Sequence, residues 1–172
     1  MQENEFSIVL KKQLKNQIEF VLHTPGNYTG GILEMTIVFD HNIECEEMKR
    51  LCSQAAALLK TTGEVFRNVR LNVVDWLSDE SIENAVMPLS MLQLGRIREP
   101  WIVSEKEKTL EALCSRLKLF HARSKLILVL TDGSYQTGDK NKAKEALQPF
   151  LYRKLILLEN NIVKPGRELL KL

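Results

Sequence analysis

Short apolar runs rich in β-branched residues alternate along this chain with longer segments whose apolar residues recur at helical spacing. Such runs are typical of strands that are buried on both faces of a parallel sheet, and helices between them form right-handed crossovers. The sequence therefore predicts an α/β fold: a three-layer, Rossmann-like, mostly parallel sheet flanked by helices. The predicted strands are 32–39, 69–76, 125–130 and 154–158, and the predicted helices are 46–60, 105–121 and 143–151.

The 172 residues are enough for one globular domain with its own core. Residues 5–22 carry an apolar stripe at helical spacing, and the loop HTPGNYTGG ends this first element. We expect residues 1–31 to form an N-terminal helical or irregular extension and residues 32–172 to form the α/β domain, with a short last helix over 166–172. The region 77–103 predicts no clear element, although 87–92 has the composition of a short strand.

Composition and charge exclude several classes of function. Twenty-four basic residues against twenty-two acidic ones give a formal charge of +2, far from the balance of a nucleic-acid-binding domain. No apolar run has the length of a signal peptide or a membrane span, so we expect a cytoplasmic protein that does not bind membranes. The three cysteines lack C-x-x-C spacing, which indicates neither a disulfide framework nor a zinc site. Cys52 and Cys114 fall on apolar helical faces and are predicted to be core residues.

Two aspartates stand at the ends of predicted strands. Asp40 closes the strand 32–39, and Asp132 follows the strand 125–130. In a parallel sheet such positions lie at one edge, and neighbouring strands would bring both carboxylates into one crevice. Asp40, Asn42 and Glu44 are spaced at i, i+2 and i+4 in a single loop, which can direct three oxygen atoms to one point. Together with Asp132 they are the predicted ligands of a divalent cation such as Mg²⁺.

The same residues also fit purely structural roles. Asp40 or Asn42 could cap the following helix, and Asp132 could form a Thr-Asp-Gly turn in which Gly133 supplies a positive φ. The sequence does not decide between these roles and metal binding. His41 adjoins the candidate site and is expected to be a surface residue.

The chain resembles the von Willebrand factor A domain in TIVFD, EEMKRLCSQAAALL, LNVVDW, ILVLTDG and KLILL, a likeness that covers residues 32–172. In that family the motif D-x-S-x-S, a loop threonine and a second aspartate form the metal-ion-dependent adhesion site. The resemblance implies Mg²⁺ or Mn²⁺ at the top of the sheet, with a carboxylate of a partner protein completing the coordination.

This sequence departs from the family motif in a way that changes its chemistry. Asp40 and Asp132 match, but Asn42 and Glu44 replace the two serines, and only Ser104 stands in for the loop threonine. A glutamate ligand would cancel much of the positive charge that attracts a partner's carboxylate. We therefore expect a degenerate site that either holds a cation for structural reasons or holds none.

The resulting hypothesis is a non-enzymatic, intracellular protein-interaction module with a protein partner of unknown identity. The alternative is a metal-dependent phosphoester hydrolase that uses Asp40 and Asp132, although the motif Asp-His-Asn lacks the second aspartate that phosphatases of the haloacid dehalogenase type carry. A nucleotide-binding Rossmann domain is disfavoured because neither G-x-G-x-x-G nor G-x-x-x-x-G-K follows a strand.

Overall fold

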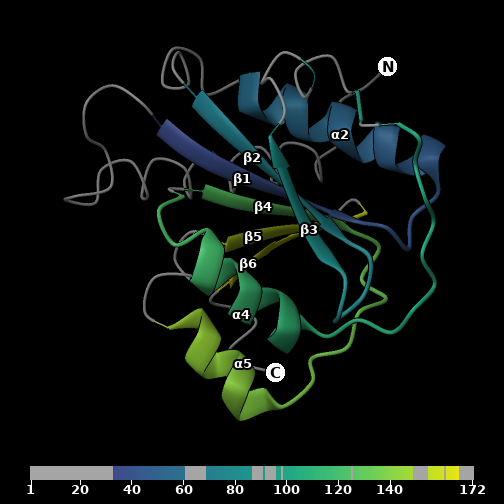
Figure 1. Cartoon of the computed structure of the whole chain (residues 1–172). Helices are drawn as coiled ribbons and strands as arrows, with labels where there is room; N and C mark the ends of the chain where they lie inside the picture. Colours follow the sequence, from purple (N-terminus) through teal and green to yellow (C-terminus); the bar gives the residue numbers. More distant parts are fainter. Residues whose placement is uncertain are drawn as a thin grey trace.

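The computed structural model describes residues 33–60, 69–86, 91, 96–97, 99–124, 126–148, 155–160 and 162–166. Within these residues, six strands form one mixed sheet with three helices around it, which confirms the predicted α/β class with a mostly parallel sheet (Figure 1). The predicted extension over 1–31, most of 87–92 and the predicted last helix after its first residue lie outside the described residues. None of the described helices is long and apolar enough to cross a membrane.

The sheet has the strand order β3-β2-β1-β4-β5-β6. Its inner strands β1, β2, β4 and β5 are mutually parallel and lie within one residue of the four predicted strands, whereas the antiparallel edge strands β3 and β6 were not predicted. The strands are β1 (Leu33–Asp40), β2 (Val69–Trp76), β3 (Ile82–Val86), β4 (Leu126–Thr131), β5 (Leu155–Glu159) and β6 (Ile162–Pro165). The helices are α2 (Cys45–Lys60), α4 (Leu110–Phe120) and α5 (Lys140–Leu147).

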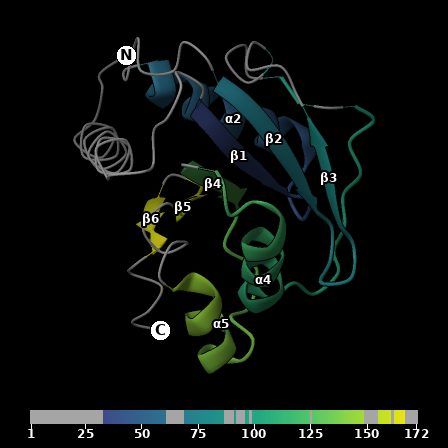
Figure 2. The ribbon, with the colours of Figure 1, turned by 60° about the vertical axis from the view of Figure 1, so that its left-hand side comes forward.

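The sheet is covered on both faces, as its continuously apolar strands require. Alternate residues of β1 pack on either side: Phe39 belongs to the cluster that includes Leu51 of α2, and Val38 to the cluster that includes Leu113 of α4. Figures 1 and 2 show α2 on one side of the sheet and α4 with α5 on the other. Helix α4 starts later than predicted because Thr109 acts as its N-cap, with its hydroxyl accepting a hydrogen bond from the amide of Ala112.

The parallel strands end in a row of larger or polar residues on the face covered by α4 and α5. Asp40 pairs with Trp76 of β2, and Thr131 pairs with Glu159 of β5. The residues directly before Asp40 and Thr131, Phe39 and Leu130, pair with each other, so Asp40 and Thr131 are neighbours across β1 and β4. All four of these row residues are buried. The fold therefore places Trp76, Asp40, Thr131 and Glu159 side by side at the carboxyl edge of the sheet, the edge at which sites form in α/β proteins.

A second polar cluster joins α4 to the opposite end of the sheet. His121, the C-cap of α4, is buried, and its Nε2 lies 2.9 Å from Oδ1 of Asn84 on β3. Its Nδ1 lies 3.4 Å from the hydroxyl of Thr36, which also contacts Ser124. This arrangement suits a neutral ring in which Nε2 donates and Nδ1 accepts. Burial lowers the pKa of His121 below its ordinary value of 6.5, an effect that Arg116 strengthens and Glu34 opposes.

The lowered pKa of His121 predicts a loss of stability in mild acid. As the pH falls below about 6.5, the unfolded chain takes up a proton at this ring while the folded chain does not, so the free energy of unfolding decreases by at most about 1.4 kcal/mol per pH unit from this group. Urea denaturation between pH 8 and pH 5 measures the slope. We expect His121→Gln to flatten it; an unchanged slope in that variant would show that His121 is not its source.

Candidate functional site

Asp40 is the centre of the polar network at the carboxyl edge of the sheet. Its side chain is fully buried, and both carboxylate oxygens accept hydrogen bonds. Oδ1 lies 2.6 Å from Nζ of Lys108 and 3.0 Å from the amide nitrogen of Asn42, and Oδ2 lies 2.6 Å from the hydroxyl of Thr131. The carboxylate is therefore satisfied by one cation and two neutral donors, which is the condition under which a charge can be buried.

Lys108 supplies the positive charge of the network, and its side chain is also fully buried. Besides Asp40, its ammonium group contacts Oδ1 of Asn42 at 2.9 Å and the carbonyl oxygen of Ser104 at 3.5 Å. It also lies 5.8 Å from the centroid of the Trp76 ring, within the range of a cation–π interaction. Three oxygen atoms thus surround the three donors of one ammonium group.

Lys108 lies 68 residues after Asp40 in the sequence, and the segment 101–109 places it beside Asp40. Ser104 holds its middle, because its amide donates to the carbonyl of His41 at 2.7 Å and its hydroxyl to the carbonyl of Leu77 at 2.7 Å. At its end, Thr109 donates its amide and its hydroxyl to the carboxylate of Asp79 at 2.7 and 3.1 Å. The carbonyl of Lys108 accepts from the amide of Gln136 at 2.8 Å. These hydrogen bonds hold the backbone on both sides of Lys108 in place, and the side chain of Lys108 points into the interior.

The loop after β4 joins the network from the other side. Nδ2 of Asn42 donates to the hydroxyl of Ser134 at 2.8 Å, and this hydroxyl donates to Asp132 at 2.6 Å. Asp132 also accepts from the amide of Ser134, and Gly133 has a φ of +82°, so the predicted Thr-Asp-Gly turn is present. Asp132 itself is exposed. It reaches Asp40 only through Ser134 and Asn42.

The four predicted ligands thus separate into two groups. Asp40 and Asn42 converge on the ammonium group of Lys108, whereas Glu44 and Asp132 are exposed. Ser104, the predicted stand-in for the loop threonine, offers its carbonyl to Lys108 and directs its hydroxyl to Leu77. Among the described residues, no three His, Cys, Asp or Glu side chains are arranged to hold a metal ion. With Lys108 in place, this donor set does not fit a divalent cation, because the oxygens that would bind it already surround a monovalent one.

His41 is not the surface residue that we predicted. It is buried, and its Nδ1 lies 2.7 Å from the carbonyl oxygen of Ile102 while its Nε2 lies 2.9 Å from Oδ1 of Asp75. Its ring stacks on Trp101 at a centroid distance of 3.9 Å. The indole of Trp101 in turn donates to the carbonyl of Ile43 at 2.9 Å. His41 therefore anchors the start of the segment 101–109 and has no ring nitrogen left for acid–base chemistry.

Three further reactive groups lie near the core: the hydroxyl of Tyr135 and the thiols of Cys52 and Cys114. Tyr135 donates its hydroxyl to Glu159, and burial, followed by this contact, raises its pKa. Glu159 also forms an ion pair with Lys164 at 2.6 Å. Cys52 and Cys114 are buried as predicted, and burial raises the pKa of each thiol to about 12. Neither thiol is available as a nucleophile at neutral pH.

No protein-family model matches the chain, and no curated protein is similar enough in sequence to count as a match.

The residue that sequence reasoning missed is Lys108. It lies in the polar stretch SEKEKT, whose residues Glu105, Lys106 and Glu107 are exposed, so no apolar periodicity singles it out. One signal was available. Lys108 directly precedes the N-cap of α4, where the helix dipole disfavours a positive charge, so a carboxylate nearby would stabilise a lysine at that place.

We predict that Asp40 and Lys108 stabilise the fold as a coupled pair. Lys108→Met leaves a buried carboxylate without its cation, and Asp40→Asn leaves a buried cation without its carboxylate, so each should reduce the free energy of unfolding by about 3–5 kcal/mol. The double variant should lose much less than the sum of the two losses. Urea denaturation measures all three values.

Lys164→Met serves as the matched control, since it removes a lysine from the more exposed ion pair with Glu159, whose lysine side chain is 40% accessible. It should cost at most about 1 kcal/mol. Additive losses at Asp40 and Lys108 would contradict the coupling.

Proposed function

We propose that this chain is a non-enzymatic protein-interaction module of the von Willebrand factor A type, in which Lys108 takes the place of the divalent cation. The observation that carries the proposal is the 2.6 Å contact between two fully buried groups, the ammonium of Lys108 and the carboxylate of Asp40. An adhesion site of that family needs a cation beside its first aspartate. Here that positive charge is a side chain of the same chain.

The location of the network supports the family resemblance. Asp40 ends β1, Asn42 lies two residues later in the D-x-S-x-S register, and Asp132 follows β4, the neighbour of β1. These are the places that the adhesion motif would occupy on a parallel sheet. Fold-level likeness alone is a weak basis for function, so the proposal depends on the residues at these places.

A lysine in place of the cation changes how a partner is recognised. A metal ion with an open coordination position binds a partner's carboxylate directly, whereas the donors of Lys108 are directed at oxygens of its own chain. Recognition would then depend on surface shape and charge and would not require a divalent ion.

The arrangement also argues against phosphoester hydrolysis. As a nucleophile, Asp40 would need an accessible oxygen, but its side chain is fully buried and each oxygen accepts a hydrogen bond. Asp132, the second acid of the alternative hypothesis, is exposed and turned to Ser134. We expect no turnover of p-nitrophenyl phosphate with Mg²⁺ or Mn²⁺. Turnover that disappears in Asp40→Asn would overturn the proposal in favour of the hydrolase.

The occupancy of the cation position is tested by the response of thermal stability to divalent ions. The wild-type chain should show almost no rise in Tm with 10 mM MgCl₂ or MnCl₂. Lys108→Ala frees the oxygens of Asp40 and Asn42, and a dissociation constant near 1 mM for the ion would then add about 1.4 kcal/mol, or a rise of about 3–6 °C. Differential scanning calorimetry measures the shift.

Two comparisons make this experiment decisive. The double variant Lys108→Ala/Asp40→Asn should lose the ion response, and Lys164→Ala should never acquire it. A rise of many degrees in the wild-type chain, abolished by Asp40→Asn alone, would show that the native site binds a metal despite Lys108.

A further inference from the structure

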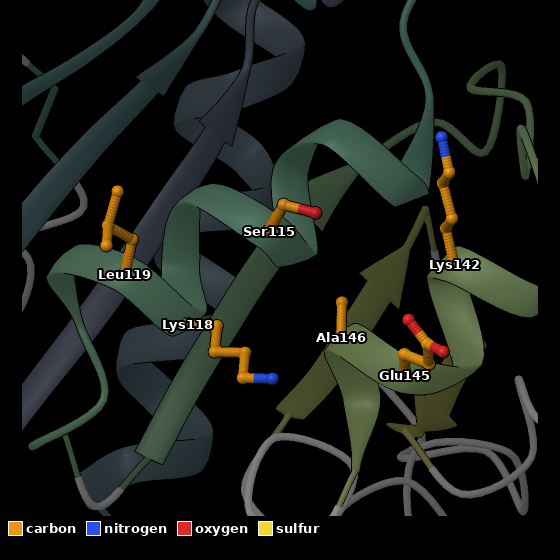
Figure 3. A pocket seen from close by; sticks show the side chains of 6 residues that line it. All are labelled: Ser115, Lys118, Leu119, Lys142, Glu145 and Ala146. Carbon is orange, nitrogen blue, oxygen red and sulfur yellow. The ribbon is translucent and has the colours of Figure 1, made fainter.

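Helices α4 and α5 leave an open groove on the side of the sheet away from α2. The groove has a volume of about 600 Å³ and lies between the exposed faces of the two helices (Figure 3). Its lining residues are Ser115, Lys118, Leu119, Lys142, Glu145 and Ala146. Small side chains form the middle of the groove, and in Figure 3 Leu119 lies at one end of it, with Lys118 beside it, and Lys142 lies at the other end.

The groove combines an apolar surface with unneutralised positive charge. Leu119 is 73% exposed, whereas the neighbouring Phe120 is partly covered by the guanidinium of Arg116, 4.7 Å from its ring centroid. Within the described part of the chain, the ion pairs involve neither Lys118 nor Lys142. An exposed leucine in the same groove as two lysines that form no ion pair within the described residues is the pattern of a binding surface for an acidic, partly apolar ligand.

The two helices that form the groove carry a net positive charge as a whole. Helices α4 and α5 together carry five basic residues and two acidic ones. Of the two acids, Glu145 lines the groove and Glu111 lies outside the lining, where it accepts a hydrogen bond from the amide of Asp139 at 2.8 Å. Within the groove lining itself, the two lysines are opposed by one acid, Glu145, so the lining carries a small net positive charge.

We propose that this groove binds an acidic amphipathic helix of a partner protein, an inference that rests on the proposed interaction function. Apolar residues of the partner helix would pack on Leu119, and its carboxylates would meet Lys118 and Lys142. A helix suits a groove between two helices because its ridge of side chains fits between theirs. The shorter of the two helices, α5, has eight residues and extends for about 12 Å, enough to seat about two turns of such a helix.

Two other occupants fit the chemistry less well. A second copy of this chain, docked through the same face, would place Lys118 and Lys142 against a surface of equal charge. A nucleic acid would meet Glu145, and none of the six lining residues is aromatic, so the groove offers no ring on which bases stack.

The first test uses a defined probe, a fluorescein-labelled fourteen-residue peptide with Leu and Ala on one helical face and Glu on both flanks. Fluorescence anisotropy should detect binding that weakens with salt. Lys118→Glu/Lys142→Glu should weaken it at least about tenfold, whereas Lys140→Glu/Lys144→Glu, with the same charge change outside the groove lining, should weaken it by less than about threefold. A peptide of the same composition without amphipathic order should bind poorly.

Several results would overturn the inference. These are no binding of the probe up to 1 mM, equal loss in the two double variants, tighter binding of single-stranded DNA, or self-association through this face in sedimentation.

The second test separates this inference from the proposed function. Benzoylphenylalanine is placed at Leu119 or at the exposed Ser134, and the full-length chain is irradiated in extracts of its own cells. A protein cross-linked at Leu119 through an acidic helix, mapped by mass spectrometry, would support the groove. A protein cross-linked only at Ser134 would exclude the groove and keep the interaction function, and no cross-linked protein at either position would count against both.

Discussion

The ion pair between Asp40 and Lys108 is the constraint on which the carboxyl edge of the sheet depends. Both side chains are fully buried, and removing two charges from water carries a desolvation cost that Coulomb attraction alone does not reliably repay. The donors around Asp40 and the acceptors around Lys108 make the arrangement stable. Since these partners come from the ends of β1 and β4 and from the turn before α4, the pair joins three distant stretches of sequence at one point.

A buried lysine differs chemically from a bound metal ion. Its charge is covalently attached, so it cannot be removed by dilution or by a chelator, and it needs no metal supply. Its donors are few and directional, so once they are satisfied no position is left for an external ligand. A divalent cation with a vacant coordination position can bind an external ligand directly. The ammonium group of Lys108, whose contacts are to oxygens of its own chain, is a structural element.

Much of the fold follows from the sequence because the inner strands are buried on both faces and carry an unmistakable apolar pattern. The edge strands β3 and β6 are short, and β6 ends at Pro165, which suits an edge but breaks the usual strand composition. At the site, we predicted Asp132 beside Asp40, and in the structure it is the preceding residue, Thr131, that contacts Asp40. β4 ends at Thr131, one position later than predicted, and because side chains alternate between faces, Thr131 points to Asp40 while Asp132 points outward. Lys108 could not be found by periodicity, because its burial depends on long-range contacts of the segment 101–109.

The polar network around Asp40 and Lys108 and the groove between α4 and α5 lie on the same side of the sheet, and the structure connects them. Lys108 directly precedes Thr109, the N-cap of α4, and the isolated bridge between Thr109 and Gln136 fixes the start of α4 beside the loop that leads into α5. The Asp40–Lys108 pair therefore helps to set the relative position of the two helices that form the groove. In an adhesion site of the family type, a metal ion at this edge would itself contact the partner. Here the charge at that edge would act indirectly, by holding α4 and α5 at the separation that a third helix requires.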